Sequence, residues 1–382
     1  MKNQHQVVLS LGSNQGNRLE NIEKCLLLIH QEVGTIIQVS KVYETPSWGF
    51  ESDAFYNCAI RIHTHKNAHE ILIQVLAIEK QLGRIRLGTY GYQSRSIDID
   101  LISFDLEIIS TENLQIPHPL MQERKFVLLP MQDLNLNWKH PILNKNTTEL
   151  LATCPDKSSC KVIHNLENPL DQIQLKQFQF IAFEGNIGAG KTSLTTKIAE
   201  DFKAKILKER FADNPFLPQF YEDQKRYALP LELSFLVDRH KQLTSDLEKL
   251  ATNTEWIVAD YSVFKSLIFA KITLDEREYK LYHSLFESIY KEFSKPDLYV
   301  YLYQNQDRLL ANIKKRGRDY EQNISESYLE KINTGYLEFM QSNTLKNKIL
   351  IDITNLDFVK NQLDYVKVLE KIKEGITNLS TV

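Results

Sequence analysis

The sequence predicts two domains of different fold class: an α+β domain in the N-terminal half and an α/β domain with a five-stranded parallel sheet in the C-terminal half. Two observations support this. The N-terminal half mixes its periodicities in the order strand, helix, strand, strand, helix, strand, whereas the C-terminal half alternates short apolar segments with long helical ones. At 382 residues the chain has room for two domains, each with its own core.

The N-terminal elements follow from the spacing of apolar residues. Apolar or β-branched runs predict strands over residues 6–11, 36–43, 56–63 and 97–104, and helical stripes predict helices over residues 17–33 and 68–82. This order fits a ferredoxin-like α+β sandwich, in which helices cover one face of the sheet and leave the other face for a site.

In the C-terminal half, strands are predicted over residues 178–184, 204–208, 256–259, 297–302 and 348–353. Long helical segments separate them, which favours a parallel, doubly wound sheet. Residues 165–176 are polar, carry Pro169 and show no sustained period. We therefore predict domains over residues 1–165 and 177–382, joined by a linker at residues 166–176.

The composition narrows the class of protein. The chain has 46 basic and 49 acidic residues, a net charge of −3, so no overall field favours nucleic acid or a membrane surface. Its polar N-terminus leads directly into a strand, which argues against a signal peptide, and no apolar run is long enough to span a bilayer. We expect a cytoplasmic enzyme with small-molecule substrates and with neither nucleic acid nor a membrane as a partner.

The four cysteines do not form a disulfide framework. Cys154, Cys160 and His164 cluster near the predicted boundary, and a zinc site there is an alternative. Their spacing matches no standard pair of ligands and a fourth ligand is missing, so the alternative is not favoured.

A complete P-loop lies between the strand at residues 178–184 and a predicted helix. Its glycines allow backbone N–H groups to turn toward phosphate oxygens, its lysine adds a charge for the outer phosphates, and its threonine hydroxyl can bind Mg²⁺. The motif predicts an ATP site formed by Gly185, Asn186, Ile187, Gly188, Ala189, Gly190, Lys191 and Thr192.

The strongest chemistry of the N-terminal half is the pair Asp98 and Asp100. On a strand these side chains project from one face while Ile97, Ile99 and Leu101 pack the opposite face. Hard oxygen ligands at this spacing suit Mg²⁺ bridged to nucleotide phosphates. The alternative is an edge strand with solvated carboxylates. Guanidinium and imidazole groups nearby favour polyphosphate transfer; they belong to Arg84, Arg86, Arg95, His118 and Arg124.

With these residues, the chain resembles the 6-hydroxymethyl-7,8-dihydropterin pyrophosphokinase family of folate biosynthesis over about residues 5–164. The matching segments are Leu11-Gly-Ser-Asn14, Val42-Tyr-Glu-Thr-Pro46, Phe55-Tyr-Asn57, Gly83-Arg84, Gln93-Ser-Arg95-Ser-Ile-Asp98-Ile-Asp100, Pro117-His118-Pro119 and Arg124-Lys-Phe126. The resemblance implies transfer of a diphosphate from ATP to the hydroxymethyl group of the pterin.

The resemblance also implies roles for single residues. Asp98 and Asp100 would hold two Mg²⁺ ions. The phosphates would meet Arg84, Arg95, His118 and Arg124, and the pterin slot would be lined by Thr45, Pro46, Asn57, Tyr92 and Phe126, with Phe55 or Tyr56 flanking the ring. Tyr92 stands where the family often has a tryptophan, and Trp48 where it often has a smaller residue. For each aromatic residue, ordinary core packing is the alternative.

In the C-terminal half, the acceptor must be inferred from residues at the carboxyl ends of the predicted strands, where open parallel sheets bind ligands. Glu209 follows one strand and could accept a hydroxyl proton during phosphate transfer. Asp260 follows another and is predicted to join Thr192 at Mg²⁺. The basic run at residues 314–318 suits a lid over phosphates; a solvated helix end is its alternative.

Residues 178–375 resemble the deoxynucleoside kinase family, especially its bacterial purine-directed members. The matching segments are Gly185–Thr192, Glu209, Asp213-Asn-Pro-Phe216, Tyr221, Leu229-Pro-Leu-Glu232, Asp260-Tyr-Ser262 and Arg316-Gly-Arg318 with Glu321. The resemblance implies that Glu209 is the base for the 5′-hydroxyl, that Tyr221 and Glu321 hold the sugar 3′-hydroxyl, and that Arg316 and Arg318 form the lid. A homodimer through this domain is also implied.

Two positions depart from that family. Tyr261 replaces an arginine that helps to organise the catalytic carboxylate, and Arg210 is a candidate to take over its role. Glu232 replaces a glutamine that reads the base edge. A carboxylate only accepts hydrogen bonds, so a guanine edge with adjacent donors would suit Glu232.

The favoured interpretation is a bifunctional MgATP-dependent enzyme, a pterin pyrophosphokinase fused to a deoxynucleoside kinase. A nucleoside-monophosphate kinase in the second half is an alternative, but no second phosphate-binding set for the acceptor is evident. The second alternative is that the C-terminal half is a degenerate P-loop domain that serves as an interaction module.

Overall fold

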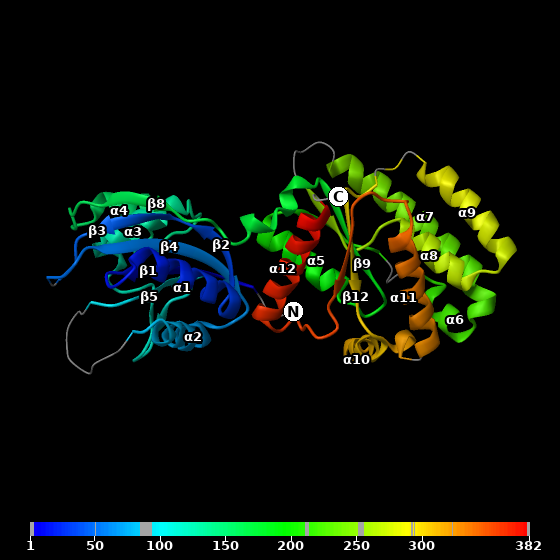
Figure 1. Cartoon of the computed structure of the whole chain (residues 1–382), viewed down its shortest axis with the longest axis horizontal. Helices are drawn as coiled ribbons and strands as arrows, with labels where there is room; N and C mark the ends of the chain where they lie inside the picture. Colours follow the sequence, from blue (N-terminus) through cyan, green and yellow to red (C-terminus); the bar gives the residue numbers. More distant parts are fainter. Residues whose placement is uncertain are drawn as a thin grey trace. The chain divides into compact units, whose positions relative to one another are not determined.

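The computed structural model describes residues 4–49, 51–84, 94–210, 214–250, 256–291, 293, 295–322 and 324–379, with the backbone alone for 245–250. Arg86, Tyr92 and Asp213 lie outside the described residues. The chain divides into two compact units: Met1–Ile173 with Asn361–Val366, and Gln174–Lys360 with Lys367–Val382 (Figure 1).

The segment predicted as a linker contains two 3₁₀ turns, Asp171–Ile173 and Leu175–Gln177. Leu170, Ile173 and Leu175 are buried. Turns of three residues are too short to give a detectable hydrophobic period, so the sequence pattern predicted a polar linker without these turns.

The first unit is built on a six-stranded antiparallel sheet with the order β5-β1-β4-β3-β8, and β2 also pairs with β4. The elements are β1 (His5–Ser13), α1 (Arg18–Glu32), β2 (Thr35–Val39), β3 (Lys41–Thr45), β4 (Phe55–Thr64), α2 (Ala68–Gln81), β5 (Asp98–Phe104), β6 (Ile109–Ser110), β7 (Gln115–Ile116), a 3₁₀ turn (Met121–Glu123), α3 (Lys125–Asp133), α4 (Thr147–Thr153) and β8 (Lys161–Asn165).

The predicted strand at residues 36–43 is two strands, β2 and β3, that break at Ser40. The Ser40 hydroxyl accepts a hydrogen bond from the Ala59 backbone N–H at 2.8 Å, which fixes the break against β4. The β-branched run continues through this point, so the sequence pattern does not reveal it. The β6–β7 hairpin, α3, α4 and β8 were not predicted.

The two faces of this sheet are covered differently. Val7, Leu9 and Leu11 of β1 point into a core beneath α1 and α2. On the opposite face, Val8, Ala59 and Ile102 pack against α3 and α4. The expectation that helices leave this second face free therefore holds only at one end of it, where Ser10, Gly12, Asn57, Asp98 and Asp100 line a cavity.

The second unit confirms the predicted five-stranded parallel sheet, with the order β10-β11-β9-β12-β13. The elements are β9 (Phe180–Gly185), α5 (Lys191–Phe202), β10 (Lys205–Leu207), α6 (Leu217–Glu222), α7 (Gln224–Leu250), β11 (Ile257–Ala259), α8 (Phe264–Thr273), α9 (Glu276–Tyr290), β12 (Leu298–Tyr303), α10 (Gln306–Arg316), a 3₁₀ turn (Asp319–Glu321), α11 (Glu326–Gln341), β13 (Lys348–Asp352) and α12 (Gln362–Leu379).

In this sheet α5 packs on one face and α7, α8 and α11 cover the other (Figure 1). Parallel pairing brings the carboxyl ends of β9, β10 and β11 to one edge, so the P-loop, Glu209 and Asp260 meet there. Of the helices that the structure describes, none combines the length and apolarity that crossing a bilayer requires.

Candidate active sites

A cavity of about 740 Å³ in the first unit is lined by side chains of β1, β4, β5 and α2. Its centre is the carboxylate pair. Because side chains alternate along β5, Asp98 and Asp100 face the cavity while the Ile99 side chain belongs to the core beneath α1 and α2.

Although β5 is an edge strand, the pair is only partly exposed: 18% of the Asp98 side chain and 30% of the Asp100 side chain are accessible to solvent. Arg84 contacts Asp98 and Glu79, and Arg95 Nη1 lies 3.1 Å from Asp98 Oδ2. Arg124 Nη1 is 3.8 Å from Asp100 Oδ2. Burial and the negative charge of Asp98 raise the pKa of Asp100 to about 7. Two carboxylates in this setting favour a further cation between them.

His118 is also on the cavity wall. Burial and the positive charge of Arg124 lower the pKa of His118 to about 4, so the imidazole is neutral. Its Nδ1 accepts a hydrogen bond from the Leu120 backbone N–H at 3.3 Å, which leaves the proton on Nε2. A neutral N–H donor of this kind suits a phosphate oxygen.

The predicted pterin residues Thr45, Pro46, Asn57 and Phe126 line the same cavity. Asn57 Nδ2 donates to Thr45 Oγ1 at 2.8 Å. A Cβ at Gly12 would lie 2.8 Å from Asn57 Oδ1, so the glycine of the Leu11-Gly-Ser-Asn14 segment makes room for this amide.

Aromatic residues separate into two groups. Phe55 lines the cavity, whereas Tyr56, its neighbour on β4, packs on the other face of the sheet beneath the Arg18 guanidinium, 3.7 Å from the ring centre. Trp48 has a contact that the sequence did not predict: the Arg124 guanidinium lies 4.9 Å from its ring centre.

Sequence reasoning missed the α2 side of the cavity, formed by Leu72, Ile73, Leu76 and Glu79. Ile73 is 69% exposed although apolar, and such residues lie beside the buried stripe of the same helix. These exposed apolar residues were the feature of the sequence from which the cavity wall could have been predicted.

Among the described residues, no cluster of three or more His, Cys, Asp or Glu side chains could hold a metal ion. Cys154, Cys160 and His164 are among the residues described, so they form no such cluster.

The second unit has a cavity of about 130 Å³ at the carboxyl edge of its sheet. Ile187, Gly188, Lys191 and Thr192 of the P-loop line it. Gly188 and Gly190 have φ of 84° and 82°, a region that disfavours other residues. Lys191 Nζ donates to the carbonyls of Gly185 and Asn186 at 2.8 and 3.0 Å. Burial and the charge of Lys265 lower the pKa of Lys191 to about 8.

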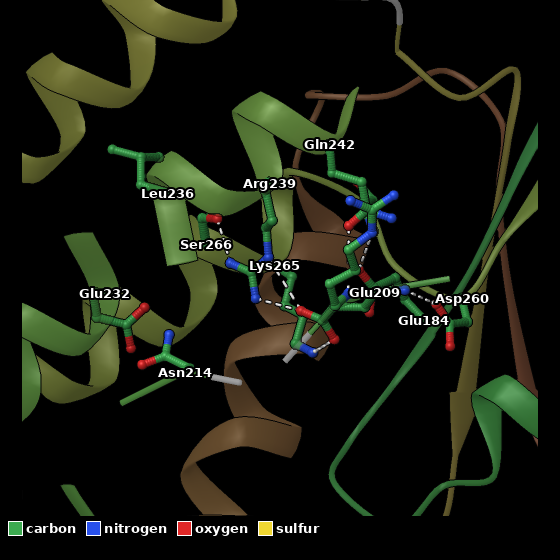
Figure 2. A network of polar contacts seen from close by, with 12 residues as sticks. Glu184, Glu209, Asn214, Glu232, Leu236, Arg239, Gln242, Asp260, Lys265 and Ser266 are labelled. Carbon is green, nitrogen blue, oxygen red and sulfur yellow. Dashed lines mark hydrogen bonds and ion pairs between the residues drawn. The ribbon is translucent and has the colours of Figure 1, made fainter. Parts of the chain in front are cut away.

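Glu209 is the centre of the network drawn in Figure 2. Its Oε1 accepts from Arg239 Nη2 at 2.6 Å and Nε at 3.1 Å, and its Oε2 lies 2.6 Å from Lys265 Nζ. Burial opposes ionisation, but Lys265 and Arg239 outweigh it and lower the pKa of Glu209 to about 2. The group is therefore a carboxylate at neutral pH.

Asp260 connects this carboxylate to the P-loop. Its Oδ1 accepts a hydrogen bond from the Glu209 backbone N–H at 2.7 Å, and its Oδ2 accepts one from the Thr192 hydroxyl. The structure thus brings together the two residues predicted to bind Mg²⁺, directly beside the predicted base.

Arg239 and Lys265 were missed by sequence reasoning. Arg239 lies on α7, two helical turns after Glu232, so the two residues share a face of the helix. This spacing was the one local feature of the sequence that could have placed Arg239 at the site. Lys265 lies in the first turn of α8, after Asp260-Tyr-Ser. Tyr261 itself is 1% exposed within the core, and Arg210 is exposed. The second cation on Glu209 is therefore Lys265.

The remaining predicted residues surround the same cavity: Tyr221, Glu232, Arg316, Arg318 and Glu321. Tyr221 stacks on Tyr320 with ring centres 6.1 Å apart. Arg316 and Arg318 both pair with the buried carboxylate of Glu321.

A P-loop on a parallel sheet, beside a buried carboxylate held by two cations, defines a nucleotide-dependent phosphotransferase. Family comparison gives the particular families. The model for "Deoxynucleoside kinase" matches residues 181–377, and that for "7,8-dihydro-6-hydroxymethylpterin-pyrophosphokinase (HPPK)" matches residues 8–136. The chain belongs to both families: it is an HPPK domain fused to a deoxynucleoside kinase domain, as the resemblances predicted.

Two curated relatives, one for each domain, agree with this assignment. The deoxyguanosine kinase of Bacillus subtilis is 33% identical over 201 residues, which is 52% of this chain and 97% of the relative. The 2-amino-4-hydroxy-6-hydroxymethyldihydropteridine pyrophosphokinase of Aquifex aeolicus is 34% identical over 158 residues, 41% of this chain and 97% of the relative. A solved structure of deoxyadenosine kinase from M. mycoides with bound dATP is 31% identical, covers 50% of this chain and 97% of its own, and has a TM-score of 0.43.

The Glu209 network predicts the effect of Lys265→Met. The substitution keeps an unbranched side chain, one atom shorter and uncharged, and leaves Arg239 as the remaining one of the two cations on Glu209. Hydrogen bonds to charged groups contribute about 1.5–3 kcal/mol, so kcat of the deoxynucleoside kinase reaction should fall about ten- to a hundredfold.

Steady-state kinetics with ATP and a deoxynucleoside measure this effect. Lys271→Met is the matched control, because Lys271 lies on the same helix but is exposed and paired with Glu338. Wild-type kcat in Lys265→Met would show that Arg239 alone positions Glu209.

Proposed function

We propose that the first domain transfers a diphosphate from ATP to 6-hydroxymethyl-7,8-dihydropterin and that the second transfers the γ-phosphate of ATP to the 5′-hydroxyl of a purine deoxynucleoside. The observation that carries the second activity is the ionised, buried Glu209 beside the P-loop. For the first activity it is the Asp98–Asp100 pair, which faces a cavity large enough for two substrates.

In the first site, Asp98 and Asp100 would hold Mg²⁺, since a pair of close carboxylates with a raised pKa at Asp100 suits a divalent cation. The metal would supply charge neutralisation for the transferred diphosphate. The phosphate oxygens would accept hydrogen bonds from three charged donors, Arg84, Arg95 and Arg124, and from one neutral donor, His118.

The ion pairs of Asp98 support an exchange of partners when metal and phosphate bind. Arg84 and Arg95 pair with Asp98 in the structure, and cations bound at the carboxylates would free both guanidinium groups for phosphate. Thr45, Pro46, Asn57, Phe55 and Phe126 would hold the pterin.

In the second site, Glu209 would accept the proton of the 5′-hydroxyl while Arg239 and Lys265 keep the carboxylate ionised and oriented. Thr192 and Asp260 would hold Mg²⁺ with the ATP phosphates. Tyr221 and Glu321 would bind the 3′-hydroxyl, and Arg316 and Arg318 would close over the phosphates. The purine preference rests on Glu232 and on the names of the relatives.

We also propose domains over residues 1–165 and 177–382 with a linker at 166–176, which the division after Ile173 supports. The strand order around β1 supports a ferredoxin-like first domain.

A homodimer through the kinase domain is supported by exposed apolar side chains on two neighbouring helices, Val237 of α7 and Leu281 and Leu285 of α9. Light scattering on the full chain tests it: a single-chain mass would contradict the dimer, and Leu281→Glu should convert a dimer to that mass.

The first prediction here concerns the carboxylate pair. Asp98→Ala or Asp100→Ala should abolish pterin-dependent AMP formation, because one carboxylate cannot hold the metals that neutralise the diphosphate. AMP release is measured with ATP and the pterin. Deoxynucleoside phosphorylation by the same preparation serves as the control and should be unchanged. Near wild-type AMP release by the double variant would rule out the two-metal assignment.

The second prediction concerns the base. Glu209→Gln keeps the shape of the side chain but cannot accept the proton, which commonly costs about 10²–10⁴ in rate. We expect kcat of the kinase reaction to collapse while ATP still binds through Lys191 and Thr192, and pterin pyrophosphorylation to continue normally.

Glu338→Gln, at an exposed carboxylate of the same domain, is the matched control. Normal deoxynucleoside phosphorylation by Glu209→Gln would move the base elsewhere, with Asp260 the next candidate. Simultaneous loss of the pterin reaction would contradict independent sites.

A further inference from the structure

The carboxyl group of Glu232 is buried in the kinase cavity without an ion pair among the contacts that the structure describes. The residue is 2% exposed, and the Thr273 hydroxyl lies 3.2 Å from its Oε1. Arg239, on the same helix, directs its guanidinium to Glu209 and to the Ser266 hydroxyl instead (Figure 2). Glu232 is therefore a buried acid beside a ligand cavity. Its described side-chain partner is the Thr273 hydroxyl, whose single proton is shared with the Phe269 carbonyl at 2.9 Å.

The position of Glu232 on α7 suits the base edge of a nucleoside, which is the end opposite the 5′-hydroxyl. Glu232, Phe235 and Arg239 all line the cavity, on one face of the helix. Seven residues at 1.5 Å each separate Glu232 from Arg239 by about 10 Å along the axis. This is comparable with the distance from the base edge of a purine nucleoside to its 5′-hydroxyl. When the hydroxyl is at Glu209, the base edge is at Glu232.

Both charge states of Glu232 are accessible in this environment. Arg239 and Lys265 favour the carboxylate, and Glu209 opposes it. The Tyr282 hydroxyl donates to the Glu232 backbone carbonyl at 3.3 Å, and burial together with the charge of Glu232 raises the pKa of both Tyr282 and Tyr328, so these two neighbours are neutral. Burial outweighs the cations and raises the pKa of Glu232 to about 7.

The two charge states present different hydrogen-bonding patterns. A carboxylate accepts two hydrogen bonds and matches the N1–H and N2–H donors of guanine. A carboxylic acid donates one and accepts one, and matches the N1 acceptor and N6–H donor of adenine. Neither base edge titrates near neutral pH.

We propose that proton binding at Glu232 selects the purine: the ionised form accepts deoxyguanosine, and the protonated form accepts deoxyadenosine. The inference rests on the proposed deoxynucleoside kinase activity. It makes one site serve both purines, with a preference that depends on pH.

The expected pH dependence follows from the charge state of Glu232 that each nucleoside requires. Because kcat/KM reports the ionisation of the free enzyme, kcat/KM for deoxyguanosine should fall as the pH drops below the pKa of Glu232, and that for deoxyadenosine should fall as the pH rises above it. Ionisations shared by the two reactions cancel in their ratio. The ratio should therefore rise with pH, by about tenfold or more between about pH 6 and about pH 8.

The experiment is to measure kcat/KM for both nucleosides across this range with the full chain and with two variants. Glu232→Gln does not titrate, and its amide can both donate and accept, so its ratio should not change with pH. Thr273→Val removes the hydroxyl that favours the carboxylate, so the pH at which the two kcat/KM values are equal should rise.

The outcomes are distinct. A wild-type ratio that is constant with pH, or one that keeps the same slope in Glu232→Gln, overturns the inference while leaving the kinase activity established. Phosphorylation of neither purine at any pH would instead contradict the proposed function. Deoxyinosine, which keeps N1–H but lacks the amino group, should follow deoxyguanosine in its pH profile with a lower kcat/KM.

Discussion

Both sites depend on one constraint, the cost of keeping a carboxylate away from water. A buried charge is destabilising unless it is paired and hydrogen-bonded, so each carboxylate here has the charge state that its partners permit. Glu209 has Arg239 and Lys265 and is an anion with a depressed pKa. Those two residues come from α7 and α8, and Asp260 of the β11 end binds its backbone. Glu209 therefore connects α7, α8 and the end of β11.

Carboxylates with other partners reach other states in the same chain. Asp100 lies beside Asp98 with its arginine at 3.8 Å, and its pKa is raised to about 7. Among the described residues, the direct partner of the Glu232 carboxyl group is a hydroxyl, and burial raises the pKa of Glu232 to a similar value. The environments give one functional group three states: a carboxylate kept ionised by two cations, a partly exposed pair in which one pKa is raised, and a buried acid with a pKa near neutrality.

The sequence predicted the parts of this arrangement that are local. The P-loop, the alternation at Asp98 and Asp100, and the strands that end before Glu209 and Asp260 are each contained in fewer than about ten residues, where period and motif are informative. Arg239 and Lys265 were beyond reach, because they are 30 and 56 residues from Glu209 in the chain and meet it only through the packing of α7 and α8. The helix at 68–82 was predicted correctly, but its contribution to the cavity wall was not. The break at Ser40 and the short elements after β5 leave no period to detect.

Two of the departures from the family patterns, Trp48 and Tyr261, have compensating contacts in the structure. Trp48, where a smaller residue is common, lies beneath the Arg124 guanidinium, which also pairs with Asp100, so the larger ring packs against a guanidinium group of the cavity wall. Tyr261, in place of an arginine, is buried in the core, and Lys265, four residues later, supplies a cation to Glu209. Since a lysine is a flexible point charge where an arginine is a rigid fork, the carboxylate keeps its charge but depends on Arg239 for its orientation. Arg239 donates to Glu209 through two nitrogens and is itself fixed by Ser266. The site thus separates two tasks, charge and geometry, between two residues on different helices.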